Sequence, residues 1–175
     1  MSIDVGAVAP GFDLVDQHGQ DVSLAGLRGR RAALVVFYPW AFSGVCTAEL
    51  GALQDDVTAF VNDDVQLVAI SCDPMFTLRA FADAREITFA LLSDFWPHGQ
   101  VARAYGVFDE RHGCATRGTF VIDAAGLVRW KVENATTDAR QIQDYRAALA
   151  GLSHRPRVMR TAIGSASARD GSVAY

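Results

Sequence analysis

An unbroken apolar run at residues 32–38 is the feature that most constrains how this chain can fold. A run of this length without polar residues is expected of a central strand that is buried on both faces. Residues 65–71 form a second, mostly apolar run. Strands covered on both faces need helices on both sides, and segments with helical periodicity lie between the strands of this chain. We therefore expect an α/β fold with a mixed or parallel sheet between layers of helix.

The remaining elements follow from periodicity and turn residues. An N-terminal hairpin is expected within residues 12–24, turning at Gly19, and an antiparallel pair at residues 118–123 and 127–132, joined by a turn containing Gly126. Helical patterns of apolar residues predict four helices. These helices are expected at residues 43–61, 77–85, 99–105 and 139–152.

Length and composition favour one domain followed by a tail. The chain has 175 residues, half of them apolar, which suffices for a single core. We expect this domain at residues 1–152 and a basic, flexible tail at residues 153–175. The tail carries a net charge of +3 and the body −7, and an acidic body argues against binding nucleic acid. No apolar run is long enough to span a membrane and no leader is visible, so a cytoplasmic protein is expected.

The three cysteines, Cys46, Cys72 and Cys114, are odd in number and contain no CxxC pair. This pattern excludes a disulfide framework and a thiolate zinc cage, and it fits a reducing compartment. We expect neither a metal nor a cofactor.

Cys46 lies in the most informative segment, where the first buried strand leads through a short loop into a helix that carries this cysteine in its first turn. Free backbone N–H groups and the helix dipole favour a thiolate over a thiol there. Ser43 occupies the position where a thioredoxin-type dithiol enzyme would carry its first cysteine, which leaves a single thiol. Alternatively, Cys46 is a small core residue on the apolar stripe with Leu50 and Leu53.

The pattern PxxxSxxC, formed by Pro39, Ser43 and Cys46 and followed by Glu49, resembles the active-site signature of peroxiredoxins. The resemblance extends over residues 3–150, includes the segments 92–99 and 117–123, and implies a thioredoxin-like fold. The family more often has threonine at the position of Ser43. Two further segments, 95–99 and 105–108, resemble the alkyl hydroperoxide reductase E group of this family.

The resemblance implies a thiol-dependent peroxidase that reduces hydrogen peroxide or organic hydroperoxides through a sulfenic acid. Cys46 would be the peroxidatic nucleophile. Arg117 would stabilise the thiolate and the charge on the breaking O–O bond. Ser43 would orient the peroxide, Pro39 would shield the thiolate from water, and Glu49 would hold the arginine.

The sulfenic acid must then be reduced by a second thiol. Cys72 follows a buried strand at the sheet edge where Cys46 is expected, and Cys114 lies three residues before Arg117. If Cys114 and Arg117 share one regular strand, their side chains point to opposite faces. Neither cysteine matches a known position of a resolving cysteine in the family, so structural thiols and a one-Cys mechanism are expected.

The partners expected from the resemblance are a peroxide, an external thiol and a second copy of the chain in a homodimer. The reductant would be thioredoxin-like or, given fifteen arginines and one lysine that hint at a GC-rich source, mycothiol with a mycoredoxin. Four aromatic residues are expected either in the core or in an apolar wall around the peroxide and the dimer contact. They are Trp40, Phe42, Phe95 and Trp96.

Three alternatives to a peroxidase stay open at this point. One is a slow-reacting redox sensor or binding protein with a thioredoxin fold, and another is a redox-regulated chaperone. A Cys-His protease dyad would need His98 or His112 to approach Cys46 in space.

Overall fold

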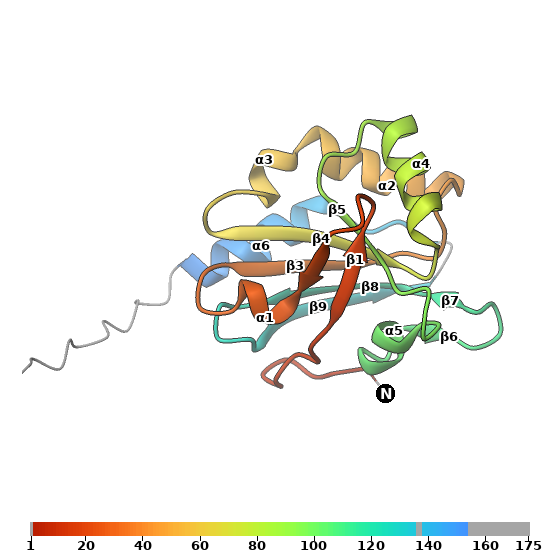
Figure 1. The fold of residues 1–175 in the computed structure, drawn as a ribbon. Helices are drawn as coiled ribbons and strands as arrows, with labels where there is room; N and C mark the ends of the chain where they lie inside the picture. The colour runs from red at the N-terminus through yellow and green to blue at the C-terminus, as the bar shows by residue number, and fades with distance from the viewer. Residues whose placement is uncertain (1, 136–137, 154–175) are drawn as a thin grey trace, which may run out of the picture.

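The computed structural model describes residues 2–135 and 138–153. Its strands are β1 (Asp13–Asp16), β2 (Asp21–Ser23), β3 (Ala32–Phe37), β4 (Val65–Ser71), β5 (Ala90–Ser93), β6 (Phe108–Asp109), β7 (Cys114–Ala115), β8 (Arg117–Ile122) and β9 (Val128–Asn134). Seven of them form one sheet in the order β2-β1-β5-β4-β3-β8-β9, and β6 pairs with β7 separately (Figure 1). The sheet is mixed, because β3, β4 and β5 are parallel whereas the other neighbouring strands are antiparallel.

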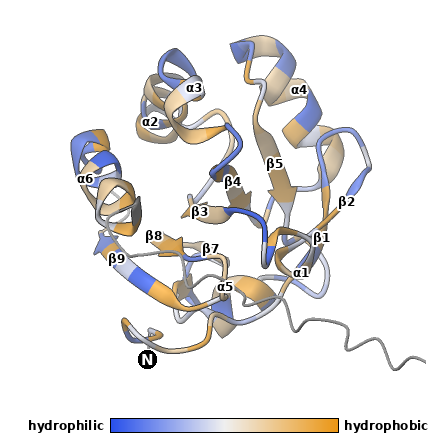
Figure 2. Ribbon diagram, turned by 90° about the vertical axis from the view of Figure 1, so that its left-hand side faces the viewer, coloured by the Kyte–Doolittle hydropathy of each residue, from blue (hydrophilic) through white to orange (hydrophobic). Residues whose placement is uncertain are grey.

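Helices cover both faces of this sheet. They are α1 (Leu24–Leu27), α2 (Gly44–Asp55), α3 (Val57–Phe60), α4 (Met75–Arg85), α5 (Gln100–Ala104) and α6 (Ile142–Ser153). Side chains of α2, α3, α4 and α6 share one apolar cluster, and those of α1 and α5 share another on the opposite face (Figure 2). The expected α/β fold with a central mixed sheet and an N-terminal hairpin is confirmed.

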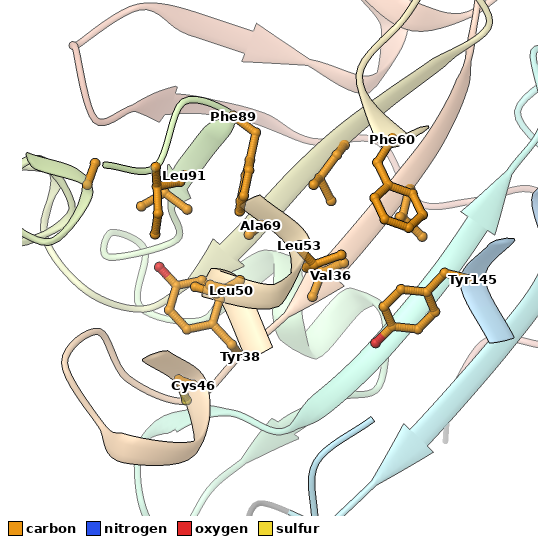
Figure 3. Packing of buried hydrophobic residues seen from close by; sticks show 14 of the residues in the cluster. Val36, Tyr38, Cys46, Leu50, Leu53, Phe60, Ala69, Phe89, Leu91 and Tyr145 are labelled. Carbon is orange, nitrogen blue, oxygen red and sulfur yellow. The ribbon is translucent and has the colours of Figure 1, made fainter. Parts of the chain in front are cut away.

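The central position of β3 in the sheet explains why the sequence of this strand is apolar throughout. Leu34 and Val36 belong to the cluster under α2 and α6, in which Figure 3 labels Val36. Val35 and Phe37 belong to the cluster under α1 and α5. All four side chains are fully buried. The alternation of side chains along a strand therefore places apolar groups on both faces of the sheet, and the end of β3 is held firmly where the loop to α2 begins.

One predicted helix is wrong in its extent. The pattern at residues 43–61 predicts a single helix, but the chain leaves the helical conformation at Asp56, which ends α2 and precedes α3. Aspartate in a helix interior competes with the backbone for hydrogen bonds, and the carboxylate of Asp56 pairs with Arg146 of α6. β5 was also not predicted from the sequence, because its apolar run is too short to distinguish from a loop.

Cys114 and Arg117 do not lie on one strand. Cys114 lies in β7, which pairs with β6, and the main sheet resumes only at Arg117 in β8. The opposite orientation of their side chains was expected only for a shared strand, so this expectation does not apply.

The expected boundary near residue 152 falls within the last turn of α6, and residues 154–175 lie outside the described residues. No helix in the described part of the chain is long and apolar enough to cross a membrane. No group of three or more His, Cys, Asp or Glu side chains among residues 2–135 and 138–153 could hold a metal ion.

Candidate active site

Cys46 lies in the first turn of α2, just beyond the C-terminal end of β3. Ser43 has an extended backbone at the N-cap, and its carbonyl oxygen accepts a hydrogen bond from the N–H of Thr47 at 2.8 Å. The side chain of Cys46 is 0% exposed and packs in the cluster that contains Tyr38 and Leu50 (Figure 3). The thiol therefore sits at the positive end of a helix dipole and out of contact with bulk water.

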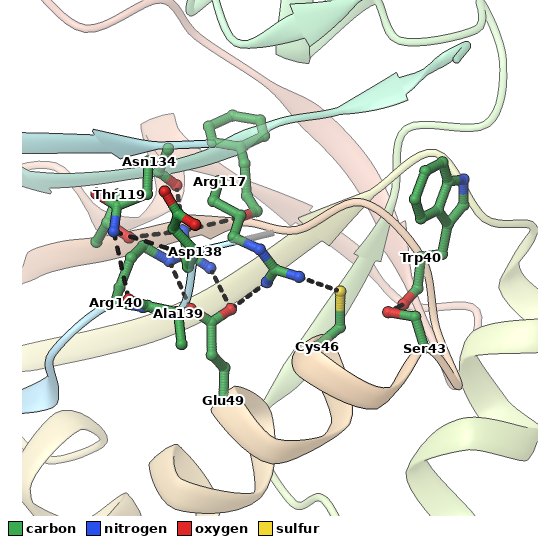
Figure 4. Close-up of polar contacts among 12 residues, drawn as sticks. Trp40, Ser43, Cys46, Glu49, Arg117, Thr119, Asn134, Asp138, Ala139 and Arg140 are labelled. Carbon is green, nitrogen blue, oxygen red and sulfur yellow. Dashed lines mark hydrogen bonds and ion pairs between the residues drawn. The ribbon is translucent and has the colours of Figure 1, made fainter. Parts of the chain in front are cut away.

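Arg117 opens β8, which runs antiparallel to β3, so its side chain starts beside the end of β3. Its Nη2 donates a hydrogen bond to the Sγ of Cys46 at 3.4 Å (Figure 4). Only 2% of Arg117 is exposed. A buried guanidinium at this distance is screened little by water, so its charge acts strongly on negative charge that forms beside it.

Glu49 lies one turn after Cys46 on the same side of α2 and joins two arginines. Its Oε2 accepts a hydrogen bond from Nη1 of Arg117. Its Oε1 accepts from the backbone N–H of Arg140 at 2.7 Å, and the Nη2 of Arg140 donates to Oε2 at 3.1 Å (Figure 4). The carboxylate thereby fixes the guanidinium of Arg117 against the sulfur.

Arg140 is a further residue of the site that was not predicted from the sequence. Its side chain is almost fully buried, and its Nη1 donates to the carbonyl oxygens of Phe37 and Gly118 and to Oγ1 of Thr119, each at 2.9 Å. Arg140 thus ties Glu49 to both strands that flank the site. It stands in a polar stretch before α6 that is typical of an exposed loop, so no signal in the sequence marked it.

The other two predicted site residues, Pro39 and Ser43, lie in the segment between β3 and α2. Pro39 is buried in the loop between β3 and α2. The hydroxyl of Ser43 donates to the carbonyl oxygen of Trp40 at 3.1 Å (Figure 4). In this structure the hydroxyl of Ser43 is therefore bonded to the backbone of its own loop.

Four aromatic residues are not in the core. Trp40, Phe42, Phe95 and Trp96 are exposed, with Trp96 at 81%. The core interpretation of these side chains is therefore wrong. The ring of Phe42 contacts Phe81 of α4 at a centroid distance of 5.0 Å, and the other three leave apolar surface free in the single chain.

Cys72 and Cys114 are buried thiols with weak acidity. Burial raises the pKa of Cys72 to about 12, and the nearby Asp94 carboxylate adds to this effect. Burial raises the pKa of Cys114 to about 11. At pH 7 such values leave roughly one thiolate in 10⁴ to 10⁵ molecules. Both side chains therefore suit a packing role.

Neither histidine considered for a protease dyad bonds to Cys46. The Nε2 of His98 lies 2.7 Å from the carbonyl oxygen of Gly113, and the Nδ1 of His112 lies 2.7 Å from Oδ2 of Asp109. The Nδ1 of His98 lies 3.3 Å from the carbonyl oxygen of Phe95, so the hydrogen-bond partners of both rings are groups other than Cys46.

Comparison with known proteins shows the family of the chain. The AhpC/TSA family model matches residues 5–131. The chain belongs to the AhpC/TSA family. Over 151 residues it is 46% identical to alkyl hydroperoxide reductase E of Mycobacterium tuberculosis, covering 86% of this chain and 99% of that protein. It is 34% identical to peroxiredoxin Bcp of Escherichia coli, covering 72% of this chain and 83% of that protein.

Solved structures of family members have the same fold. Peroxidoxin BcpB from Mycobacterium tuberculosis superimposes with a TM-score of 0.72 at 31% identity, covering 87% of this chain and 98% of that one. AhpC of Enterococcus faecalis gives 0.78 at 27% identity, covering 87% and 93%. The thioredoxin-like fold expected from the resemblance is confirmed, and this AhpC/TSA family member is a thiol-dependent peroxidase.

Proposed function

We propose that Cys46 is the peroxidatic cysteine of this enzyme. Its thiolate sulfur attacks the terminal oxygen of hydrogen peroxide or an organic hydroperoxide. An S–O bond forms, the O–O bond breaks, and the leaving oxygen takes a proton to become water or an alcohol, while Cys46 becomes a sulfenic acid. The observation that carries this proposal is the buried contact between Cys46 and Arg117, with Glu49 behind it.

Each neighbouring residue has a separate role in this step. The guanidinium of Arg117 stabilises the thiolate and the negative charge that develops on the leaving oxygen. Glu49 holds that guanidinium in place. Ser43 donates a hydrogen bond to the bound peroxide in place of its bond to Trp40, and Pro39 keeps water from the sulfur.

The proposed recycling uses an external thiol. One thiol displaces water from the sulfenic acid and forms a mixed disulfide with Cys46. A second thiol attacks that disulfide, restores the Cys46 thiol and leaves with the first as an oxidised pair. The raised pKa values of Cys72 and Cys114 support this one-Cys mechanism, because attack on a sulfenic acid needs a thiolate.

A variant with Cys72→Ser and Cys114→Ser tests the one-Cys mechanism. With a small thiol as reductant, we expect its turnover to stay within about twofold of wild type, because neither sulfur takes part. Peroxide consumption over many cycles is the measurement. Progressive inactivation of the double variant by oxidation of Cys46 to a sulfinic acid, with wild type protected, would show that one of these cysteines resolves the intermediate.

The finer assignments of partner and setting are also proposals. The reductant is thioredoxin-like or a mycothiol and mycoredoxin pair, and the identity to a mycobacterial relative supports the latter. A homodimer would cover the exposed rings of Trp40, Phe95 and Trp96. Three free cysteines in the described residues are compatible with the cytoplasm.

A further inference from the structure

The loop at residues 38–43 is the segment whose conformation the proposed chemistry depends on most. It carries Pro39 and Ser43 and leads into the helical turn that holds Cys46. Phe42 in this loop has a φ of 65°, in the left-handed region that is unfavourable for a bulky side chain. Such a conformation persists only where surrounding contacts hold it.

Asp73 provides one of these contacts from outside the loop. Its Oδ2 accepts a hydrogen bond from the backbone N–H of Ala41 at 2.9 Å. The same oxygen accepts the hydroxyl hydrogen of Ser71 at 2.8 Å. Asp73 lies two residues beyond the end of β4, and β4 is parallel to β3, so the loop and Asp73 meet at one edge of the sheet.

Asp73 is itself anchored to the ends of two strands. Its backbone N–H donates to the Oγ of Ser71 at 3.3 Å, and its carbonyl oxygen accepts from the hydroxyl of Ser93 at 2.7 Å. Ser71 and Ser93 are paired neighbours in β4 and β5, and both are buried. The carboxylate therefore acts as a fixed acceptor for the loop, and its charge strengthens the bond to Ala41.

The two halves of the catalytic cycle make opposite demands on this loop. Oxidation by a small peroxide needs Pro39 and Ser43 in position around the sulfur. Reduction by an external thiol needs access to the same sulfur, and Cys46 is 0% exposed. A larger thiol can reach it only when the segment beside it moves.

We propose that Asp73 is a positioning residue that holds the 38–43 loop in the conformation for peroxide reduction and limits its opening toward the reductant. This inference rests on the proposed role of Cys46 as the nucleophile. Loss of the Asp73 bond should therefore slow oxidation and speed up reduction.

Asp73→Ala tests this opposition when the two steps are measured separately by stopped flow. Oxidation is followed with hydrogen peroxide in the absence of thiol, and reduction of the pre-formed sulfenic acid with dithiothreitol. We expect oxidation to slow about tenfold and reduction to become several-fold faster, because a charge-assisted bond that favours the closed loop is lost. Asp73→Asn keeps an oxygen acceptor for Ala41 and should stay within about threefold of wild type.

Gln54→Ala is the matched control. Its Oε1 accepts a hydrogen bond from the backbone N–H of Thr88 at 2.8 Å, which is a similar contact at the far end of α2. Both rate constants should stay unchanged in this variant. If Asp73→Ala does not fold, Ser71→Ala removes the hydrogen bond that supports the carboxylate of Asp73. This variant should likewise slow oxidation and speed up reduction.

A parallel fall in both rate constants, or no change in either, would overturn the proposal, because a purely structural contact would not move the two steps apart. This result is distinguishable from failure of the proposed function. If the proposed function fails, Cys46→Ser will still consume peroxide, whatever the effect of Asp73→Ala.

Discussion

Arg117→Ala is expected to lower the rate constant for oxidation by hydrogen peroxide about 10²- to 10³-fold. Removing one preoriented donor to developing negative charge has an effect of this size in other enzymes. Arg117 is buried and its Nη2 lies 3.4 Å from the sulfur, so water does not replace its charge readily. Stopped-flow measurement of a single oxidation gives the rate constant. Arg117→Lys keeps the charge but loses the planar fork that reaches both Cys46 and Glu49, so only part of the rate should return.

Arg103→Ala is the control for this prediction. Arg103 is an exposed guanidinium that pairs with Glu110 outside the site. Its loss changes the net charge of the chain by the same amount and should leave the oxidation rate unchanged. Equal rates for wild type and Arg117→Ala would contradict the role assigned to Arg117.

Arg140→Ala is expected to lower the free energy of unfolding by about 3–5 kcal/mol, the range for removing one partner of a buried ion pair. The substitution leaves the carbonyl oxygens of Phe37 and Gly118 without this donor, and Glu49 with one guanidinium fewer. Urea denaturation measures the stability. Oxidation by peroxide should also slow in the folded variant, because Glu49 holds Arg117 less firmly.

Arg146→Ala separates this effect from the loss of any arginine. Arg146 pairs with Asp56 at the surface, and its side chain is largely exposed. Exposed pairs contribute up to about 1 kcal/mol, so this variant should unfold close to wild type. Similar losses of stability for Arg140→Ala and Arg146→Ala would contradict the structural role of Arg140.

The apolar runs were sufficient to predict the two central strands of the sheet. The runs at residues 32–38 and 65–71 became β3 and β4, because a strand buried on both faces leaves an unmistakable pattern. The loop and helix that follow β3 then fixed where Cys46 would lie. Arg117 and Glu49 were found through the resemblance, and the structure brings both to Cys46.

Contacts between distant segments could not be predicted in this way. Arg140 reaches Glu49 across 91 positions, and Asp73 reaches Ala41 across 32. Each stands in a loop whose sequence gives no sign of the distant partner, so only the folded structure reveals the contact. The sequence could not decide between a core position and an exposed position for Trp40 and Trp96, because apolar side chains indicate burial and give no indication of what covers them.

Mass spectrometry of the intact, non-reduced protein after one equivalent of hydrogen peroxide tests the central claim most directly. We predict one added oxygen on the peptide that contains Cys46, with Cys72 and Cys114 still thiols, and neither oxidation nor peroxide consumption in Cys46→Ser. A disulfide from Cys46 to Cys72 or Cys114 as the main product, or an oxygen placed on another cysteine, would contradict the account.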